Sequence, residues 1–302
     1  MRTSRVIPVY AVAVILLGAL LAPCLFWAVQ RLAAQTSAAQ SLAAYPFRRV
    51  FNRSVMIVAL AGLWPLLRAI GFRSWSDLGY VPSRDWWRHA LGGLALGTGS
   101  LTLVIMLTIV WGKRFLHFDK PVGQMPGVAL HFLLAGILIA LYEETFFRGA
   151  LQGAFQRGMN VVIAVILASA IYSALHFLKP NGVDIPANQV AWNSGFTCLR
   201  GIVSQPFRQD SVLIAAVTLF LAGCVLGLAY AKTGALYLPI GLHAGWVLAN
   251  ESARWLKAGT IIEDMATWPM LIVLLVVIAR LCRTTFKPLR GPGSSASGPA
   301  AL

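Results

Sequence analysis

The sequence contains few charged residues, and acidic residues are the rarest of them. Charged residues make up 12% of the 302 positions, and only 10 positions are Asp or Glu. A soluble domain carries about 25% charged residues, and a disordered chain needs low hydrophobicity. This sequence is 58% hydrophobic, which excludes both an ordinary soluble enzyme and a disordered chain.

Paired cysteines and a conventional zinc motif are also missing. The four cysteines are Cys24, Cys198, Cys224 and Cys282, and no two of them form a CxxC pair. The sequence therefore indicates neither a disulfide framework nor a cysteine metal site. HExxH does not occur, which excludes a conventional zincin motif.

Long apolar runs are what the sequence has instead. A transmembrane helix needs about 20 apolar residues, whereas a transmembrane β-barrel shows alternating segments of about ten. We therefore predict an all-α fold, a polytopic transmembrane bundle of about eight helices. The predicted spans are 6–29, 54–72, 89–111, 128–157, 161–178, 211–231, 234–251 and 267–282.

The net charge of +15 comes from basic residues that lie between the apolar runs, such as Arg48 and Arg49. Basic loops that touch anionic lipid headgroups explain this charge, so we expect a bilayer with anionic lipids as a partner and no nucleic acid. Lys and Arg divide almost evenly between the two sides of the predicted bundle. The positive-inside rule therefore does not choose an orientation.

Ionisable residues inside the predicted spans are the strongest functional signal. Glu143 and Glu144 are the only acids deep within a span, and His176 and His243 also lie within spans. Charged groups at membrane depth are costly and usually mark function. Glu144 and Arg148 are four residues apart and share a helix face, so we predict an ion pair that leaves Glu143 free to face another neighbour.

Helix geometry places these residues at one depth. If 128–157 is a single helix followed by a tight turn, Glu143 and Glu144 lie level with His176 on the next helix. His243 follows a later turn on the same side of the membrane. We therefore predict that two carboxylates and two imidazoles converge inside the bilayer, while the end of the first helix, with Gln152, Gln156 and Arg157, forms a polar tip.

Several chemistries fit this set. One carboxylate with two imidazoles and a water matches a catalytic zinc arrangement. The same residues can work without metal, with glutamate as general base and histidine sharing the water. Buried Glu and His also serve proton-coupled transporters, and a non-catalytic immunity or regulatory membrane protein is a further alternative. A transporter often has paired broken helices, whereas we see one interior break, Pro239, which is expected to kink the helix of His243.

Three motifs resemble those of one family. Residues 143–148, Glu-Glu-Thr-Phe-Phe-Arg, resemble its EExxxR motif, and Tyr172 with His176 resembles its FxxxH motif, with Tyr in place of Phe. The run 223–243 resembles the segment that leads to its last histidine. The chain is therefore similar, over 125–251, to the CPBP family of intramembrane proteases. This family includes type II CAAX prenyl endopeptidases, the Abi proteins and bacteriocin-processing and lysostaphin-resistance-like membrane proteases.

The resemblance implies an intramembrane endopeptidase acting on prenylated CaaX-type tails or on other membrane-associated peptides and proteins. It implies that Glu143 and His176 activate the attacking water and that His243 completes the site as a metal ligand or oxyanion stabiliser. Glu144 and Arg148 match the rest of the first motif. Both glutamate-type and metallo-type mechanisms stay open. In the metallo-type, Glu143, His176 and His243 would hold Zn²⁺.

The chain departs from the family at one site position. Many members carry Asn four residues after the last histidine, where this chain has Val247. Asn250, seven residues after His243, shares its helix face and is predicted to substitute. The resemblance also implies a multi-pass protein of a bacterial inner (plasma) membrane.

The rest of the chain carries no motif. We expect 1–124 to add transmembrane helices and interfacial loops to the 125–251 core, and 252–302 to add a last helix and a disordered basic tail. The connection 179–210 is long for a link between helices. It is expected either to gate substrate entry or to lie passively at the membrane interface.

Overall fold

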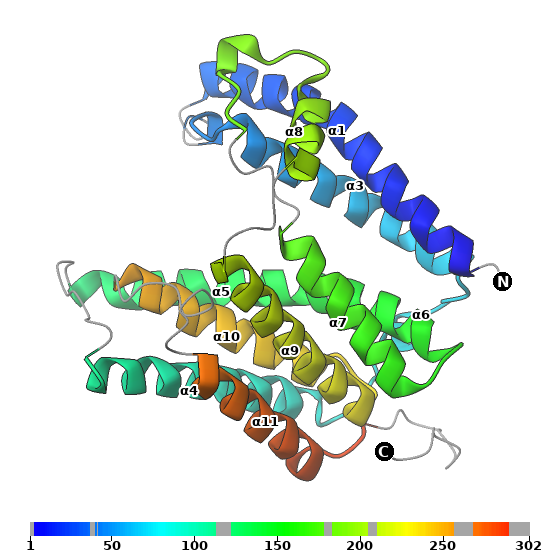
Figure 1. Cartoon of the computed structure of the whole chain (residues 1–302), viewed down its shortest axis with the longest axis vertical. Coiled ribbons are helices and arrows are strands. Elements are labelled where there is room, and N and C mark those ends of the chain that lie inside the picture. The colour runs from blue at the N-terminus through cyan, green and yellow to red at the C-terminus, as the bar shows by residue number, and fades with distance from the viewer. Residues whose placement is uncertain are drawn as a thin grey trace. The chain divides into compact units, whose positions relative to one another are not determined.

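The computed structural model describes residues 3–36, 40, 42–112, 122–177, 183–204, 210–256 and 268–289 (Figure 1). Over these residues the secondary structure is entirely helical, which confirms the all-α prediction. The nine main helices of the described ranges are α1 (Thr3–Gln35), α3 (Phe47–Ala69), α4 (Trp86–Val110), α5 (Met125–Glu144), α7 (Val161–Phe177), α8 (Ser194–Ser204), α9 (Asp210–Thr233), α10 (Tyr237–Trp255) and α11 (Trp268–Thr285). Short helical segments are η1 (Trp75–Leu78), η2 (Val122–Gln124), η3 (Thr145–Gln152), α6 (Gly153–Gln156) and η4 (Ala187–Gln189).

Five helical segments among the described residues are long and apolar enough to cross a membrane. They are Val6–Gln35, Phe47–Ala69, Trp86–Val110, Met125–Gln156 and Val212–Thr233. The chain is therefore a multi-pass integral membrane protein. Helices α7, α10 and α11 coincide with the three other predicted spans, although they do not meet the same criteria.

The chain divides into two compact units. The first comprises Met1–Arg73 with His176–Phe207, and the second comprises Ser74–Leu175 with Arg208–Leu302. Neither predicted boundary, after residue 124 or after residue 251, separates these units. The assignment of separate roles to 1–124, 125–251 and 252–302 stays a prediction.

The first unit packs α8 against α1 and α3. Its core contains Ala19, Phe47, Phe51 and Cys198, which are almost fully buried. Gly195 at the start of α8 lies so close to α1 that an added Cβ would collide with the backbone of Ala19. The middle of the connection predicted to gate entry is thus a packed helix.

Part of the connection 179–210 belongs to the hydrophobic core of the first unit. Residues 178–182 and 205–209 lie outside the described ranges, and the part between them contributes Val183, Ile185 and Ile202 to the same core. Replacing that part by a flexible linker would remove core side chains from the first unit. Gating by this connection stays a prediction, and a deletion would not test it cleanly.

The second unit is built around α10, which lies between α4 and α5 in Figure 1 and packs on both. Glycines make its contact with α4 unusually close. A Cβ added at Gly93 or Gly97 would meet backbone atoms of α10, and one added at Gly241 or Gly245 would meet backbone atoms of α4. The two glycine pairs, each spaced by four residues, therefore let the two backbones interlock around the turn that carries His243.

The first site helix is continuous but changes its winding. α5, η3 and α6 together run from Met125 to Gln156, and α7 begins at Val161, which confirms a single helix followed by a tight turn. A segment near its C-terminal end, Thr145–Gln152, is π-helical rather than α-helical. π-helical segments are rare and frequently occur at functional sites. Here the change begins at the residue after Glu144.

The kink predicted at Pro239 is wrong, because α10 begins at Tyr237 and Pro239 lies in its first turn. The first N–H groups of a helix have no intrahelical acceptor, so a proline there removes no hydrogen bond. The chain turns at Gly234, whose φ is 65°. The Ala235 carbonyl, expected to be freed by the proline, accepts a hydrogen bond from the Thr233 hydroxyl at 3.0 Å.

Candidate functional site

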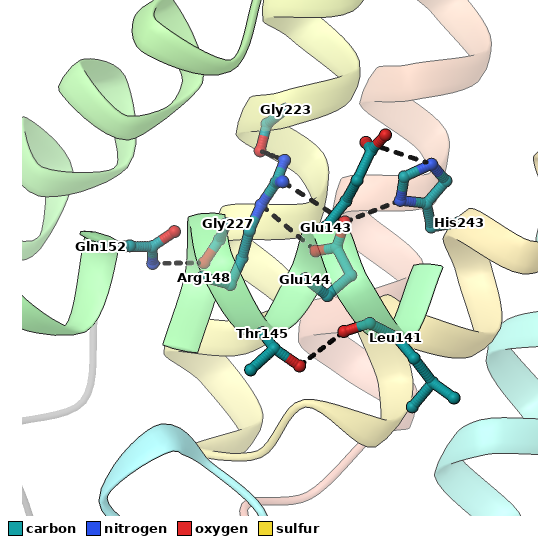
Figure 2. Close-up of polar contacts among 9 residues, drawn as sticks. All are labelled: Leu141, Glu143, Glu144, Thr145, Arg148, Gln152, Gly223, Gly227 and His243. Atoms are coloured by element: carbon teal, nitrogen blue, oxygen red, sulfur yellow. Dashed lines mark hydrogen bonds and ion pairs between the residues drawn. The ribbon is translucent and has the colours of Figure 1, made fainter. Parts of the chain in front are cut away.

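Two neighbouring carboxylates and one imidazole meet in the second unit. Glu143 and Glu144 lie at the end of α5, and His243 lies near the middle of α10. Figure 2 shows one carboxylate facing each nitrogen of the His243 ring. The side chains of adjacent helix residues point in directions about 100° apart. The His243 ring contacts both glutamates because each of its nitrogens faces a different one.

The Glu144–Arg148 ion pair confirms the prediction from their spacing. Arg148 Nε lies 3.3 Å from Glu144 Oε2, and its Nη1 donates to Glu144 Oε1 at 3.3 Å. Both side chains are almost fully buried, with exposed fractions of 1% and 0%. The third guanidinium nitrogen, Nη2, donates to the Gly223 carbonyl of α9 at 3.2 Å. The fork of Arg148 thus ties Glu144 to a second helix.

Glu144 also fixes the orientation of His243. Its Oε1 lies 2.7 Å from His243 Nδ1, so Nδ1 is the nitrogen that carries a proton and donates it. In the neutral ring Nε2 is then an acceptor. Nε2 faces Glu143 Oε2 at 3.9 Å, which is too long for a direct hydrogen bond. A water hydrogen-bonded to both atoms can bridge such a separation.

Gln152 is a buried polar residue that the sequence reasoning misplaced in a polar hairpin tip. Its side chain is fully buried, and its Nε2 donates to the Gly227 carbonyl at 2.9 Å. A Cβ at Gly227 would meet Gln152 Oε1 at 2.7 Å. Arg148 and Gln152 are four residues apart, as are Gly223 and Gly227. This matched spacing was the sequence signal that could have predicted the contacts between the two polar side chains and the two glycine carbonyls.

His176 lies on the last turn of α7, four residues after Tyr172, and is half-buried. This spacing puts the two residues on one face of the helix. The boundary between the two units falls between Leu175 and His176. The participation of His176 in the site with Glu143 and His243 therefore stays a prediction.

Asn250 also stays a predicted site residue. It lies two turns after His243 on α10, and its side-chain amide donates to Glu251 at 3.4 Å. Glu251 in turn pairs with Arg254 at 2.9 Å. Val247, at the family's asparagine position, packs against Gly136 of α5.

The predicted zinc ligands are only partly assembled. A catalytic zinc site takes three protein ligands. Across the described ranges, no three His, Cys, Asp or Glu side chains are close enough to hold a metal ion. Glu143 faces Nε2 of His243, the nitrogen left open because Glu144 engages Nδ1, and these two groups are one ligand fewer than the three required. The donor set of the described residues therefore does not fit the metal.

Replacing Arg148 by lysine is expected to destabilise the protein by about 3 kcal/mol, the scale for breaking a buried ion pair. Lysine keeps the charge but cannot donate to Glu144 and to the Gly223 carbonyl with one planar fork. Thermal unfolding in detergent measures the effect. Arg254→Lys, at an exposed ion pair, is the matched control and should leave the midpoint unchanged. Equal midpoints for both variants would contradict the buried fork.

Comparison with known proteins locates this cluster within a family domain. No curated protein matches the chain. Residues 125–249 match the family model described as type II CAAX prenyl endopeptidase Rce1-like. The match contains the Glu143–Arg148 motif and His243, and it confirms the family resemblance noted in the sequence. The chain therefore carries, over residues 125–249, a domain of the Rce1-like type II CAAX prenyl endopeptidase family.

Proposed function

We propose that this protein is an intramembrane endopeptidase that hydrolyses a peptide bond with a glutamate-activated water. The observation that carries the proposal is the buried cluster of Glu143, Glu144, Arg148 and His243 in apolar helices of the family domain. Such a cluster is costly in an apolar surrounding and has an evident use in proton transfer. A passive scaffold does not need it.

In the proposed reaction Glu143 is the general base. A water between Glu143 Oε2 and His243 Nε2 gives a proton to Glu143 while its oxygen attacks the carbonyl carbon of the scissile bond. The carbonyl π electrons move to the carbonyl oxygen and form a tetrahedral oxyanion. On collapse the carbon–nitrogen bond breaks, and Glu143 returns the proton to the leaving amine. Atoms and charge balance without a further reactant.

The other residues hold the base and the imidazole in place. Glu144 keeps His243 in one orientation through the 2.7 Å contact with Nδ1, and Arg148 neutralises Glu144. His243 then orients the water by accepting a hydrogen bond from it at Nε2. We propose that His176, four residues after Tyr172, donates a hydrogen bond to the oxyanion. Preorganised polar groups of this kind supply much of the rate enhancement of hydrolases.

The proposed substrates are membrane-associated peptides, with prenylated CaaX tails the first to be tested because of the matched family. We further propose that α7, α10 and α11 complete eight membrane spans with the five long apolar segments. The protein would then be a multi-pass protein of a bacterial inner membrane, with its basic connections on anionic headgroups.

The experiment uses the full-length protein in liposomes and a farnesylated CaaX peptide with a fluorophore and quencher on either side of the scissile bond. Expected is cleavage that depends on Glu143, with the cut site read by mass spectrometry. A peptide library from native membranes serves as a second substrate set. No cleavage of either set, together with proton uptake driven by a pH gradient, would instead favour the transporter alternative.

Metal removal separates the two hydrolytic mechanisms. Because no three-ligand group occurs among the described residues, activity is expected to survive treatment with a strong chelator. The measurement compares the initial rate before and after chelation, with metal content determined in the same samples. Loss of activity on chelation and its recovery with zinc would overturn the metal-free mechanism and support Glu143, His176 and His243 as ligands.

A further inference from the structure

The segment of residues 78–80, which precedes α4, contacts both helices that carry the proposed catalytic groups. Leu78 ends η1 and is fully buried. On one side it packs on the π-helical segment, where a Cβ added at Gly149 would lie 2.8 Å from the Leu78 carbonyl oxygen. On the other side the Gly79 carbonyl accepts a hydrogen bond at 3.0 Å from the N–H of Leu236, the residue before α10. This segment therefore links the helix of the two glutamates to the helix of the histidine.

Tyr80 extends a hydroxyl to the point where the glutamate helix changes its winding. Its Oη lies 2.6 Å from Oγ1 of Thr145, the first π-helical residue. The Thr145 hydroxyl in turn donates to the Leu141 carbonyl (Figure 2). A threonine hydroxyl has a single hydrogen, and a carbonyl oxygen can only accept. Tyr80 is therefore the donor to Thr145, and the two hydroxyls form a relay from Tyr80 through Thr145 to Leu141.

The relay spans the turn of the helix that carries both glutamates. A threonine that bonds the carbonyl four residues earlier often bends a helix, and here α5 gives way to the π-helical segment directly after Glu144. The winding beyond that point sets the direction in which Arg148 projects. Arg148 holds Glu144 through the buried ion pair, and Glu144 holds His243. A contact that fixes the start of the π-helical segment therefore acts on the whole cluster.

The ring of Tyr80 has packing partners of its own. The Trp75 ring lies edge-on at 5.9 Å between centroids, and the Tyr237 ring lies edge-on at 6.2 Å. Phenylalanine would keep both of these contacts. The hydrogen bond to Thr145 can therefore be removed without removing the packing of the ring.

We propose that Tyr80 is a positioning residue whose hydroxyl, acting through Thr145, fixes the start of the π-helical segment and thereby the placement of the glutamates against His243. The inference rests on the proposed function for its kinetic consequence, although its effect on the site can be measured without catalysis. Tyr80 lies before the matched family domain, which covers residues 125–249. The part of the chain that precedes the domain thus supplies a group that orders the site within it.

The first test replaces Tyr80 by phenylalanine in the full-length protein. The matched control is Tyr237→Phe, because the Tyr237 hydroxyl belongs to the same aromatic group but donates to the Val81 carbonyl at 3.2 Å. Expected for Tyr80→Phe is an unchanged KM and a kcat about tenfold lower, a part of the roughly 100-fold loss that a 1 Å misplacement of catalytic groups can cause. Tyr237→Phe should change neither quantity.

Variants of Thr145 test the relay from its other end. Thr145→Val keeps the shape of the side chain but removes the hydroxyl, so it should lower kcat as Tyr80→Phe does. Thr145→Ser keeps the hydroxyl and should retain the wild-type rate. Because both positions act through one relay, the double variant of Tyr80→Phe with Thr145→Val should be no slower than either single variant. If Tyr80→Phe does not fold, the comparison of Thr145→Val with Thr145→Ser makes the same test.

Nuclear magnetic resonance tests the positioning independently of activity. The proton on His243 Nδ1 lies in the 2.7 Å contact with Glu144 and reports the geometry of that contact. In protein labelled with ¹⁵N-histidine this signal is assigned by its loss in His243→Gln. Tyr80→Phe and Thr145→Val should shift it, whereas Tyr237→Phe and Thr145→Ser should not.

Two results would overturn the inference. One is a His243 signal that neither Tyr80→Phe nor Thr145→Val moves, and the other is a double variant whose losses in kcat multiply, as they do for independent sites. If wild type cleaves no substrate but the signal moves as expected, the proposed function fails and the positioning role of Tyr80 stands.

Discussion

Replacing Glu143 by glutamine is expected to abolish peptide cleavage while the protein still inserts and folds. Glutamine keeps the size and shape of the side chain but cannot accept a proton from water. General acid–base catalysis contributes about 10²–10⁴-fold to a rate, so the residual rate should fall by at least that factor. Glu144 makes the ion pair with Arg148 and the 2.7 Å contact with His243, and neither contact involves Glu143. The fold should therefore stay intact.

The measurement compares cleavage rates and thermal midpoints of wild type, Glu143→Gln and a matched control. Glu251→Gln is that control, since Glu251 also lies on a site helix but pairs with exposed Arg254. It should keep both rate and midpoint. A Glu143→Gln protein that cleaves at the wild-type rate would remove the general base from the proposed reaction and with it the hydrolase proposal.

Replacing Gly97 by alanine is expected to cause one of the largest losses of stability among single methyl additions in the second unit. The added Cβ would collide with the Leu242 carbonyl oxygen of α10, and a backbone atom cannot move aside as a side-chain end can. Overpacking of a close contact costs about 1–3 kcal/mol and sometimes more. Because Leu242 precedes His243, separation of α4 from α10 should also displace the imidazole and lower the cleavage rate.

Gly99→Ala is the matched control two residues along the same helix. A Cβ at Gly99 meets no atom within 4 Å, and alanine is intrinsically the better helix former by about 1 kcal/mol. Thermal unfolding and cleavage of both variants should therefore diverge, with Gly99→Ala equal to or slightly above wild type. If Gly97→Ala is as stable as Gly99→Ala, the close approach of α4 and α10 does not exist in the membrane.

The glycines illustrate what the sequence leaves undecided. Four glycines on α4 predict that some helix approaches closely, and Gly93 and Gly97 do face α10. A Cβ added at Gly92 would instead meet the Phe286 ring, and one added at Gly99 would meet no atom within 4 Å. Spacing along one helix shows which residues share a face, but the identity of the partner depends on segments about 150 residues away.

Features that depend on local spacing and on the cost of burying charge could be predicted from the sequence. The apolar runs predicted a helical membrane protein, and the four-residue spacing predicted the Glu144–Arg148 ion pair. The location of the only deep acids, with the three motifs, indicated the family domain and Glu143 as its candidate base. Each of these follows from 1.5 Å and 100° per helical residue and from the price of an unpaired charge in an apolar medium.

The tertiary structure alone decided how side chains from distant helices meet. It set His243 between two carboxylates, with Glu144 on Nδ1 and Glu143 facing Nε2. It buried Gln152, which a polar composition had assigned to a tip, because Gly227 of α9 leaves room for the side chain and exposes its carbonyl to the amide. Such contacts depend on the rotation and separation of packed helices, and these are set by the whole set of interhelical contacts rather than by any one segment.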